Sequence, residues 1–174
     1  MADTNILNDK LSFLLKHRDY AKALEAVKKW EQEEGLKAKN VSSDLILQIS
    51  KTYYLSKEYE KSRNYISRFE SKYSDQRFRV DYLDQKYKLL IVEGKTERAI
   101  RLIESALNPE RNDTELYDLL HCLGSAHFWN GDYFEANRYL RKCHSYYLES
   151  ADHHMLGLTL YMLGYLAFQR NMFV

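Results

Sequence analysis

Apolar residues recur at intervals of three and four along almost the whole chain, with polar residues between them. Between Asp132 and Cys143, the residues of one helical face are Tyr133, Ala136, Tyr139, Leu140 and Cys143. Such intervals are typical of amphipathic helices. The pattern predicts helices over residues 4–17, 20–34, 42–56, 58–72, 77–93, 95–108, 114–130, 132–150 and 153–170.

The predicted helices come in pairs, and one motif recurs at the start of the second helix of each pair. A small residue marks each copy, and the copies are 39, 37 and 37 residues apart, at Ala23, Ser62, Ala99 and Ala136. Four residues later each copy has an apolar residue, namely Val27, Ile66, Ile103 and Leu140. Self-similarity at this period indicates stacked helical hairpins.

The fourth copy carries the most specific pattern. Leu120-x-x-Leu123-Gly124-x-x-His127, followed by Ala136-x-x-x-Leu140, resembles the tetratricopeptide repeat. The segment Leu160-x-x-Leu163-Gly164-x-x-Ala167 is similar to the first half of the same pattern. The resemblance implies an all-α fold, an α-α superhelix that is a right-handed solenoid of tetratricopeptide-like hairpins.

The resemblance covers nearly the whole chain, so we expect a single repeat domain over residues 1–174. About four and a half repeats are predicted, at 4–40, 42–75, 77–112, 114–151 and a half repeat at 153–174. Leu11 and Tyr87 stand where Gly124 and Gly164 stand in their repeats, and these large side chains should spread their hairpins. Because the last helix lacks its partner, we expect either the N-terminal part of a longer protein or an open end covered by another chain.

Composition narrows the class of protein. The 174 residues carry 26 Lys and Arg against 25 Asp and Glu, a net charge of +1, which makes nucleic-acid binding an unfavourable interpretation. Cys122 and Cys143 cannot build a disulfide framework and are typical of a reducing compartment. We expect a cytoplasmic protein, with the nucleus as the alternative. No run of eighteen apolar residues predicts a membrane span.

Motifs for catalysis are absent from the sequence. It contains no P-loop, no GxGxxG, no HExxH and no nucleophile elbow, so we expect neither an enzyme nor a cofactor. Histidines and cysteines do gather in the last third, but no CxxC or HxxxH spacing accompanies them. Zinc needs four converging nitrogen or sulfur ligands, and we therefore predict no metal site.

The resemblance also implies a concave groove lined by the first helix of each pair. Read by register, the candidate partner-binding residues are Asp44, Lys51, Tyr54, Asp81, Asp84, Lys88, Asp118, His121, Ser125, Phe128, Trp129, Tyr161, Tyr165 and Phe168. Aromatic side chains offer large contact area at low entropy cost, so the C-terminal part suits an extended peptide or a helix. The alternative is that these aromatic residues belong to the core between repeats.

Four aspartates make the predicted groove acidic. They are Asp44, Asp81, Asp84 and Asp118. Co-chaperone members of the family bind a C-terminal carboxylate through Lys, Asn and Arg, and an acidic surface would repel such a ligand. A ligand with basic or amide character fits better. The alternative is that aspartates in a first turn only complement the helix dipole.

These observations favour a non-catalytic protein–protein interaction scaffold, a subunit or domain of a multiprotein complex. Its partner would be a protein or peptide, bound through the groove or the open C-terminal end, and a homodimer remains open. An alternative is the peptide-sensing regulatory domain of a bacterial transcriptional regulator, although residues 1–20 leave no room for a DNA-binding motif. A third interpretation, single-stranded RNA binding, is disfavoured by the charge of +1.

Overall fold

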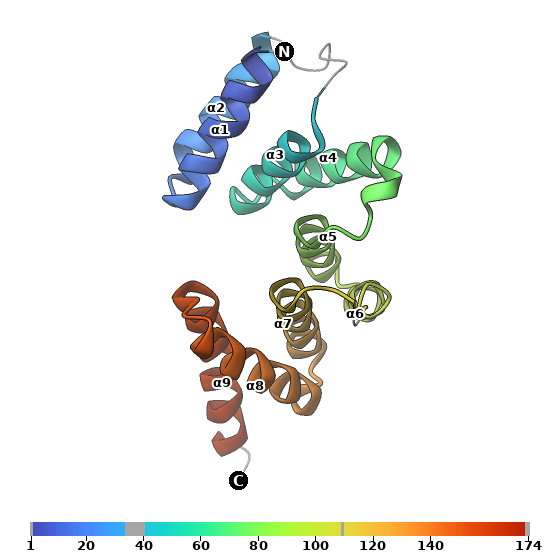
Figure 1. The fold of residues 1–174 in the computed structure, drawn as a ribbon, viewed down its shortest axis with the longest axis vertical. Coiled ribbons are helices and arrows are strands. Elements are labelled where there is room, and N and C mark those ends of the chain that lie inside the picture. The colour runs from blue at the N-terminus through green and yellow to red at the C-terminus, as the bar shows by residue number, and fades with distance from the viewer. Residues whose placement is uncertain (1, 34–40, 109, 173–174) are drawn as a thin grey trace. The chain divides into compact units, whose positions relative to one another are not determined.

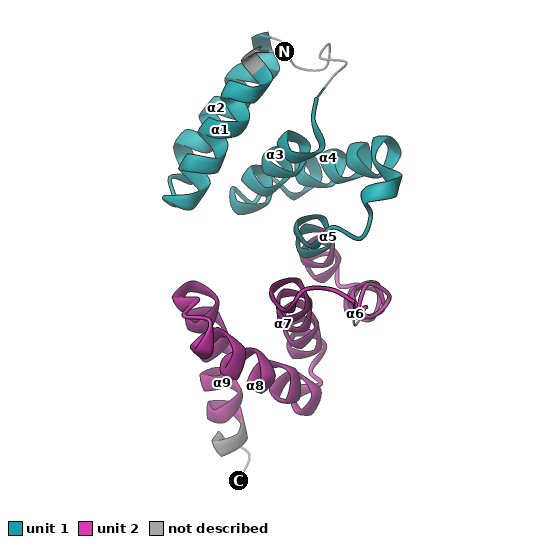
Figure 2. Cartoon of the chain, viewed as in Figure 1, with its two compact units in different colours: residues 1–85 teal, residues 86–174 magenta. Residues whose placement is uncertain are grey.

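The computed structural model describes residues 2–33, 41–108 and 110–172, and these residues form helices without any strand (Figure 1). The elements are α1 (Ala2–Lys16), α2 (Tyr20–Glu33), α3 (Ser43–Leu55), α4 (Tyr59–Lys72), the 3₁₀ helix η2 (Ser74–Gln76), α5 (Val80–Val92), α6 (Thr96–Glu104), α7 (Asp113–Asn130), α8 (Tyr133–Glu149) and α9 (His153–Met172). The chain divides into two compact units, residues 1–85 and 86–174, with the boundary inside α5 (Figure 2). The all-α prediction is confirmed, whereas the prediction of a single domain stays a prediction.

Two predicted helix bounds differ by three and four residues from those of the structure, both at connections between hairpins. Helix α6 ends at Glu104 and not at residue 108. The Arg111 Nε donates a 3.0 Å hydrogen bond to the Ala106 carbonyl oxygen, which gives that carbonyl a partner outside the helix. Asn108 also precedes a proline, which disfavours the helical conformation. Helix α5 begins at Val80 and not at residue 77, because η2 and the residues after it form a separate turn.

The turns inside the hairpins are copies of one another. Each contains one residue in the left-handed conformation, and these are Arg18 (φ 59°), Lys57 (φ 63°), Gly94 (φ 72°) and Gly131 (φ 84°). In each turn the next backbone N–H donates to a carbonyl five residues back, for example Asp132 to His127 at 2.9 Å and Lys95 to Leu90 at 2.8 Å. This is the Schellman arrangement, which gives the last carbonyls of a helix their partners.

The small residues of the repeat motif lie five positions after these left-handed residues. All four are fully buried, namely Ala23, Ser62, Ala99 and Ala136. The apolar residues four positions further on are fully buried as well, namely Val27, Ile66, Ile103 and Leu140. Residues at the same position of the repeat pattern therefore lie at equivalent positions in the structure. The second helix of each hairpin buries the same two positions.

A second small position, on the first helix of a hairpin, decides how closely the two helices approach. The Ser50 Oγ of α3 lies 3.0 Å from the Ser62 Oγ of α4 and 3.2 Å from the Ser62 carbonyl oxygen. At Gly124 of α7, a Cβ atom would lie 3.0 Å from the Leu140 Cγ of α8. Leu11 fills this position in α1, and the interface of α1 with α2 is smaller than those of α3 with α4 and of α7 with α8. This difference agrees with the predicted effect of a large residue at position 11, which stays a prediction.

Tyrosine hydroxyls and carboxylates join neighbouring helices in the first unit. Glu31 of α2 accepts hydrogen bonds from the Tyr53 hydroxyl of α3 at 2.5 Å and from the Tyr65 hydroxyl of α4 at 2.6 Å. Glu70 of α4 accepts from the Tyr82 hydroxyl of α5 at 2.6 Å. Burial, with the adjacent carboxylate, raises the pKa of each tyrosine above its ordinary value. These tyrosines therefore have a structural use.

Candidate functional site

In the first unit, Arg79 forms ion pairs with two of the predicted acidic residues, Asp44 at the start of α3 and Asp81 at the start of α5. The Arg79 Nη2 lies 2.7 Å from the Asp44 Oδ1 and 2.6 Å from the Asp81 Oδ2. The hydrogen bond to Asp81 raises the pKa of the guanidinium most, burial opposes this by a smaller amount, and the hydrogen bond to Asp44 raises the pKa further. One cation thus compensates part of the charge of two carboxylates, and this end of the predicted groove is less acidic than the sequence suggests.

The other candidates from α3 and α5 differ in their exposure and in the rings that lie near them. Lys51 is exposed, and the ring of half-buried Tyr54 lies 5.4 Å from the ring of Tyr59, centroid to centroid. Asp84 is half-buried in the first unit. Lys88, in the second unit, is half-buried with its Nζ 5.9 Å from the centroid of the Tyr87 ring.

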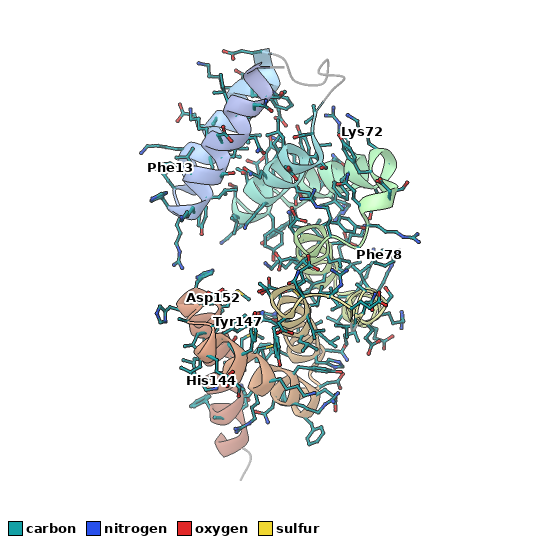
Figure 3. All side chains as sticks on the ribbon, in the orientation of Figure 1. Phe13, Lys72, Phe78, His144, Tyr147 and Asp152 are labelled. Carbon is teal, nitrogen blue, oxygen red and sulfur yellow. The ribbon has the colours of Figure 1, made fainter. Side chains whose placement is uncertain are left out.

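Three candidates on α7 face the interior of the second unit. The Tyr147 hydroxyl of α8 donates a 2.9 Å hydrogen bond to the Asp118 Oδ1 (Tyr147 is labelled in Figure 3). His121 is 7% exposed, and the Ser125 Oγ donates to the Met162 Sδ of α9 at 3.3 Å. Burial and then the charge of Asp118 raise the pKa of the Cys143 thiol to about 12. These polar groups connect α7 to α8 and α9, which limits the surface they offer to a partner.

Five aromatic residues at the end of α7 and on α9 belong to the candidate set, and all of them except Phe128 are exposed. They are called the aromatic surface below and comprise Phe128, Trp129, Tyr161, Tyr165 and Phe168. The Phe128 ring packs edge to face on Trp129 and on Tyr165, with centroids 5.4 Å and 5.2 Å apart. Phe128 itself is half-buried against the core formed with α8 and α9. Exposed fractions reach 63% for Trp129, 74% for Tyr161 and 59% for Phe168.

Charge plays little part along the exposed side of α9. The sequence from His153 to Gln169 contains no Lys, Arg, Asp or Glu. The Gln169 Nε2 donates a 2.8 Å hydrogen bond to the Tyr165 hydroxyl, so the polar atoms at this end also pair locally. A partner on this side would therefore be recognised by apolar area and shape.

Beside the aromatic surface, α9 exposes a row of small residues and one leucine, and three of these four residues belong to the repeat pattern that the sequence predicts for this helix. Gly157, Leu160, Gly164 and Ala167 are all exposed, and we call this set the glycine stripe. Its spacing of three, four and three residues places it on one side of the helix. The available signal was a pair of glycines seven residues apart within a helical pattern, where glycine is unfavourable unless close contact requires it.

In the parts of the chain that are described, no three His, Cys, Asp or Glu side chains come together in a way that suits a metal ion. None of the helices within those parts is both long enough and apolar enough to cross a membrane.

Comparisons with known proteins reveal a likeness of fold. No family model matches the sequence, and no curated protein matches it significantly. A solved structure described as "MamA RS-1 ArsTM double mutant" aligns with a TM-score of 0.54 at 12% identity, over 96% of this chain and 96% of that chain. MamA contains tetratricopeptide repeats, so the likeness supports a tetratricopeptide-like fold, and the chain is an α-α superhelix.

Proposed function

We propose that this chain is a non-catalytic scaffold that binds another protein or peptide through the aromatic surface. One observation carries the proposal: Trp129 and Tyr165 pack on the half-buried ring of Phe128 and are still exposed, as are Tyr161 and Phe168 on α9. Exposed aromatic residues around a packed anchor are typical of binding hot spots. The tetratricopeptide-like fold agrees with this function, since stacked helical hairpins offer extended binding surfaces.

The ligand we propose is apolar, in the form of an extended peptide or a helix. The uncharged sequence from His153 to Gln169 favours such a ligand over a strongly charged one. The basic ligand considered for the acidic positions has weaker support, because Arg79 already pairs with Asp44 and Asp81. Membership of a multiprotein complex, a homodimer, the cytoplasmic location and the peptide-sensing alternative remain predictions.

Site-specific photo-crosslinking tests this function. We would place p-benzoylphenylalanine at Tyr161 or at Phe168, and as a matched control at Phe134, which is 80% exposed on α8 outside the aromatic surface. In an extract of the source cells, the first two positions should crosslink to the same defined partner and the control should not. Trp129→Ala should weaken capture at least about tenfold, as expected for a hot-spot residue.

Two results would contradict the proposal. One is equal crosslinking at Phe134 and at Tyr161, which would indicate non-specific adhesion to exposed rings. The other is undiminished capture by a variant that carries both Trp129→Ala and Phe168→Ala. Far-UV circular dichroism of that variant would confirm that the helices are intact, since both side chains are more than half exposed.

A further inference from the structure

The turn between α7 and α8 contains a dipeptide that can react with itself. Asn130 is the last residue of α7 and is followed by Gly131, and no other asparagine of the sequence precedes a glycine. Glycine has no side chain to shield its backbone nitrogen, so this nitrogen can approach the carboxamide carbon of the asparagine before it. Both residues are exposed, and no described atom beyond the chain neighbours lies within 4 Å of the place of a Cβ on Gly131. The turn therefore has room for ring closure.

Two hydrogen bonds hold the Asn130 carboxamide. The Thr96 Oγ1 at the start of α6 donates to the Asn130 Oδ1 at 2.6 Å, and the Asn130 Nδ2 donates to the Asp132 Oδ2 at 2.7 Å. The Gly131 N–H donates to the Phe128 carbonyl oxygen at 3.2 Å, at the long end of the usual range. The carboxamide is thus fixed at both its oxygen and its nitrogen, whereas the backbone nitrogen beside it is held more weakly.

Ring closure requires the end of α7 to open. In a five-membered ring the Gly131 nitrogen is eclipsed with the Asn130 Cβ about the Cα–C bond, and the ordinary helical ψ of about −42° does not allow this. The last residue of a helix loses few intrahelical hydrogen bonds when it unwinds, so the backbone change is a local one. The carboxamide must also leave its partners Thr96 and Asp132. These two side-chain hydrogen bonds therefore add to the free energy needed to reach the reactive conformation.

We propose that Asn130 is a self-modification site, at which the Gly131 nitrogen attacks the Asn130 carboxamide and the hydrogen bond from Thr96 limits the rate. The bond between the nitrogen and Cγ forms, the bond between Cγ and Nδ2 breaks, and Nδ2 leaves as ammonia with the proton of the Gly131 nitrogen. Water, the co-reactant, then opens the succinimide ring at either carbonyl carbon. Opening at Cγ gives aspartate, and opening at the backbone carbon gives isoaspartate, in which the main chain runs through Cγ.

Conversion changes the electrostatics of the turn. In the aspartate product an oxygen replaces the Nδ2 donor, so two carboxylates face each other where Asn130 and Asp132 now share a hydrogen bond. The negative end of the α7 dipole disfavours the new charge as well. The His127 Nδ1, 3.4 Å from the Asp132 Oδ2, compensates this charge only when the ring is protonated. We therefore expect the modified turn to be less stable than the parent turn.

The modification also reaches the aromatic surface, because Trp129 directly precedes Asn130. Trp129 is 63% exposed, and a carboxylate beside it would disfavour an apolar partner. The isoaspartate product also lengthens the main chain by one methylene at this point. This effect on binding rests on the proposed function, whereas the chemical conversion of Asn130 does not.

Mass spectrometry of the whole chain, incubated at pH 8 and digested at intervals, tests the proposal. Asn130 should convert to aspartate and isoaspartate, more slowly than in a free peptide of residues 124–137, and an isoaspartyl methyltransferase should label the product. Thr96→Val should raise the rate about fivefold, the factor that corresponds to the loss of one hydrogen bond. Thr96→Ser keeps the hydroxyl and should react at the parent rate.

Two controls accompany the measurement. Asn137 of α8 is followed by an arginine and should stay an amide throughout. Thr114→Val removes a different hydroxyl, which lies 3.0 Å from the Tyr146 hydroxyl, and should leave the rate at Asn130 unchanged. Capture in the crosslinking experiment is a separate measurement: conversion of Asn130 without any loss of capture would contradict the effect on binding and leave the modification itself supported.

Three results would overturn the inference. The first is full conversion of the free peptide while Asn130 of the folded chain stays an amide in the parent and in Thr96→Val. The second is the same rate in the parent and in Thr96→Val, which would mean that this hydrogen bond does not limit the reaction. The third is equal acceleration in Thr96→Val and Thr114→Val, which would indicate a general loss of stability.

Discussion

Helices α7 and α9 share a sequence pattern and differ in what surrounds them. His121 of α7 is 7% exposed, whereas Tyr161, forty residues later, is 74% exposed. Ser125 is 5% exposed and its counterpart Tyr165 is 41% exposed. Helix α7 packs against α6 and α8, while α9 packs chiefly on α8. The same periodicity thus describes a covered helix and a half-covered one, and burial depends on the neighbours of a helix.

At these positions the buried residues are polar and the exposed residues are aromatic, which is the opposite of the usual distribution. The buried places on α7 hold a histidine and a serine, which pair or pack with α8 and α9, whereas the exposed places on α9 hold tyrosines. Large aromatic residues at exposed places are costly in solubility unless they serve contact. The difference is that α9 exposes residue types that interfaces often contain, although its pattern is that of a repeat helix.

The largest expected effect concerns thiol reactivity at one pair of equivalent positions. Cysteine introduced by Tyr161→Cys should react with a disulfide reagent at pH 8 at least about 100-fold faster than cysteine introduced by His121→Cys, because only exposed thiolates react readily. The native cysteines are internal controls: both are buried, and the pKa of Cys143 is raised to about 12. Similar rates for the two variants would mean that α9 is covered as α7 is.

The next effect concerns the two glycines. Gly124→Leu should lower the free energy of unfolding by about 2–3 kcal/mol, because the added side chain meets Leu140 and Tyr139. Gly164→Leu should raise it by up to about 1 kcal/mol, because leucine is a better helix former and the space is open. Urea denaturation measures both, and a loss of stability in Gly164→Leu would contradict the comparison.

A smaller change in the free energy of unfolding is expected when a hydrogen bond to α7 is removed. Tyr147→Phe removes the donor to Asp118 and should cost about 1–2 kcal/mol. Position 158 of α9 is the counterpart of Asp118, and Leu158→Ala at this 43% exposed residue should change stability by less than about 0.5 kcal/mol. Thermal and urea unfolding of both variants provide the measurement.

The same tyrosine predicts a pH dependence. Burial and Asp118 raise the pKa of Tyr147 above the ordinary value of 10.0. The folded state therefore holds this proton more tightly than the unfolded state, so the stability it contributes is present below pH 10 and is lost as the pH rises above that value. The fall in unfolding free energy above pH 10 should be shallower in Tyr147→Phe than in the parent, and an unchanged slope would count against a buried Tyr147.

The smallest effects concern the turns on either side of α8. Gly131→Ala should cost about 1 kcal/mol, because φ is 84° there and the penalty is purely conformational with no atom within 4 Å of the added Cβ. Ala151→Gly, at φ 55° before α9, should gain up to about 1 kcal/mol. In urea denaturation, the free energy of unfolding should fall for Gly131→Ala and rise for Ala151→Gly. Changes in the same direction would contradict an equivalent geometry of the two turns.

Periodicity was sufficient to predict the helices and the register of the repeat, because both depend on residues close in sequence. It was not sufficient where one side chain acts across the fold. The early end of α6 depends on Arg111, and the reduced acidity of the first unit depends on Arg79, which the pattern placed in a helix over residues 77–93 but which precedes α5 in the structure. The sequence Arg79-x-Asp81 was the one available signal for that pair.

The candidate site was harder to predict than the fold for a physical reason. Helical spacing tells which residues share a face, but each first helix has more than one partner, and spacing does not tell which faces are covered. Asp118 and Tyr161 were therefore chosen by the same rule, yet one accepts a hydrogen bond from Tyr147 and the other is mostly exposed.

The Schellman turns limit where this chain tolerates insertions and deletions. One extra residue inside such a turn would rotate the next helix by about 100° and turn its buried small residue away from the hairpin. The spacing of 39 residues between Ala23 and Ser62, against 37 in the other intervals, has its extra length between one hairpin and the next. New peptide segments or tags are therefore best placed at the connections after α2, α4 and α6, and not at the left-handed residues.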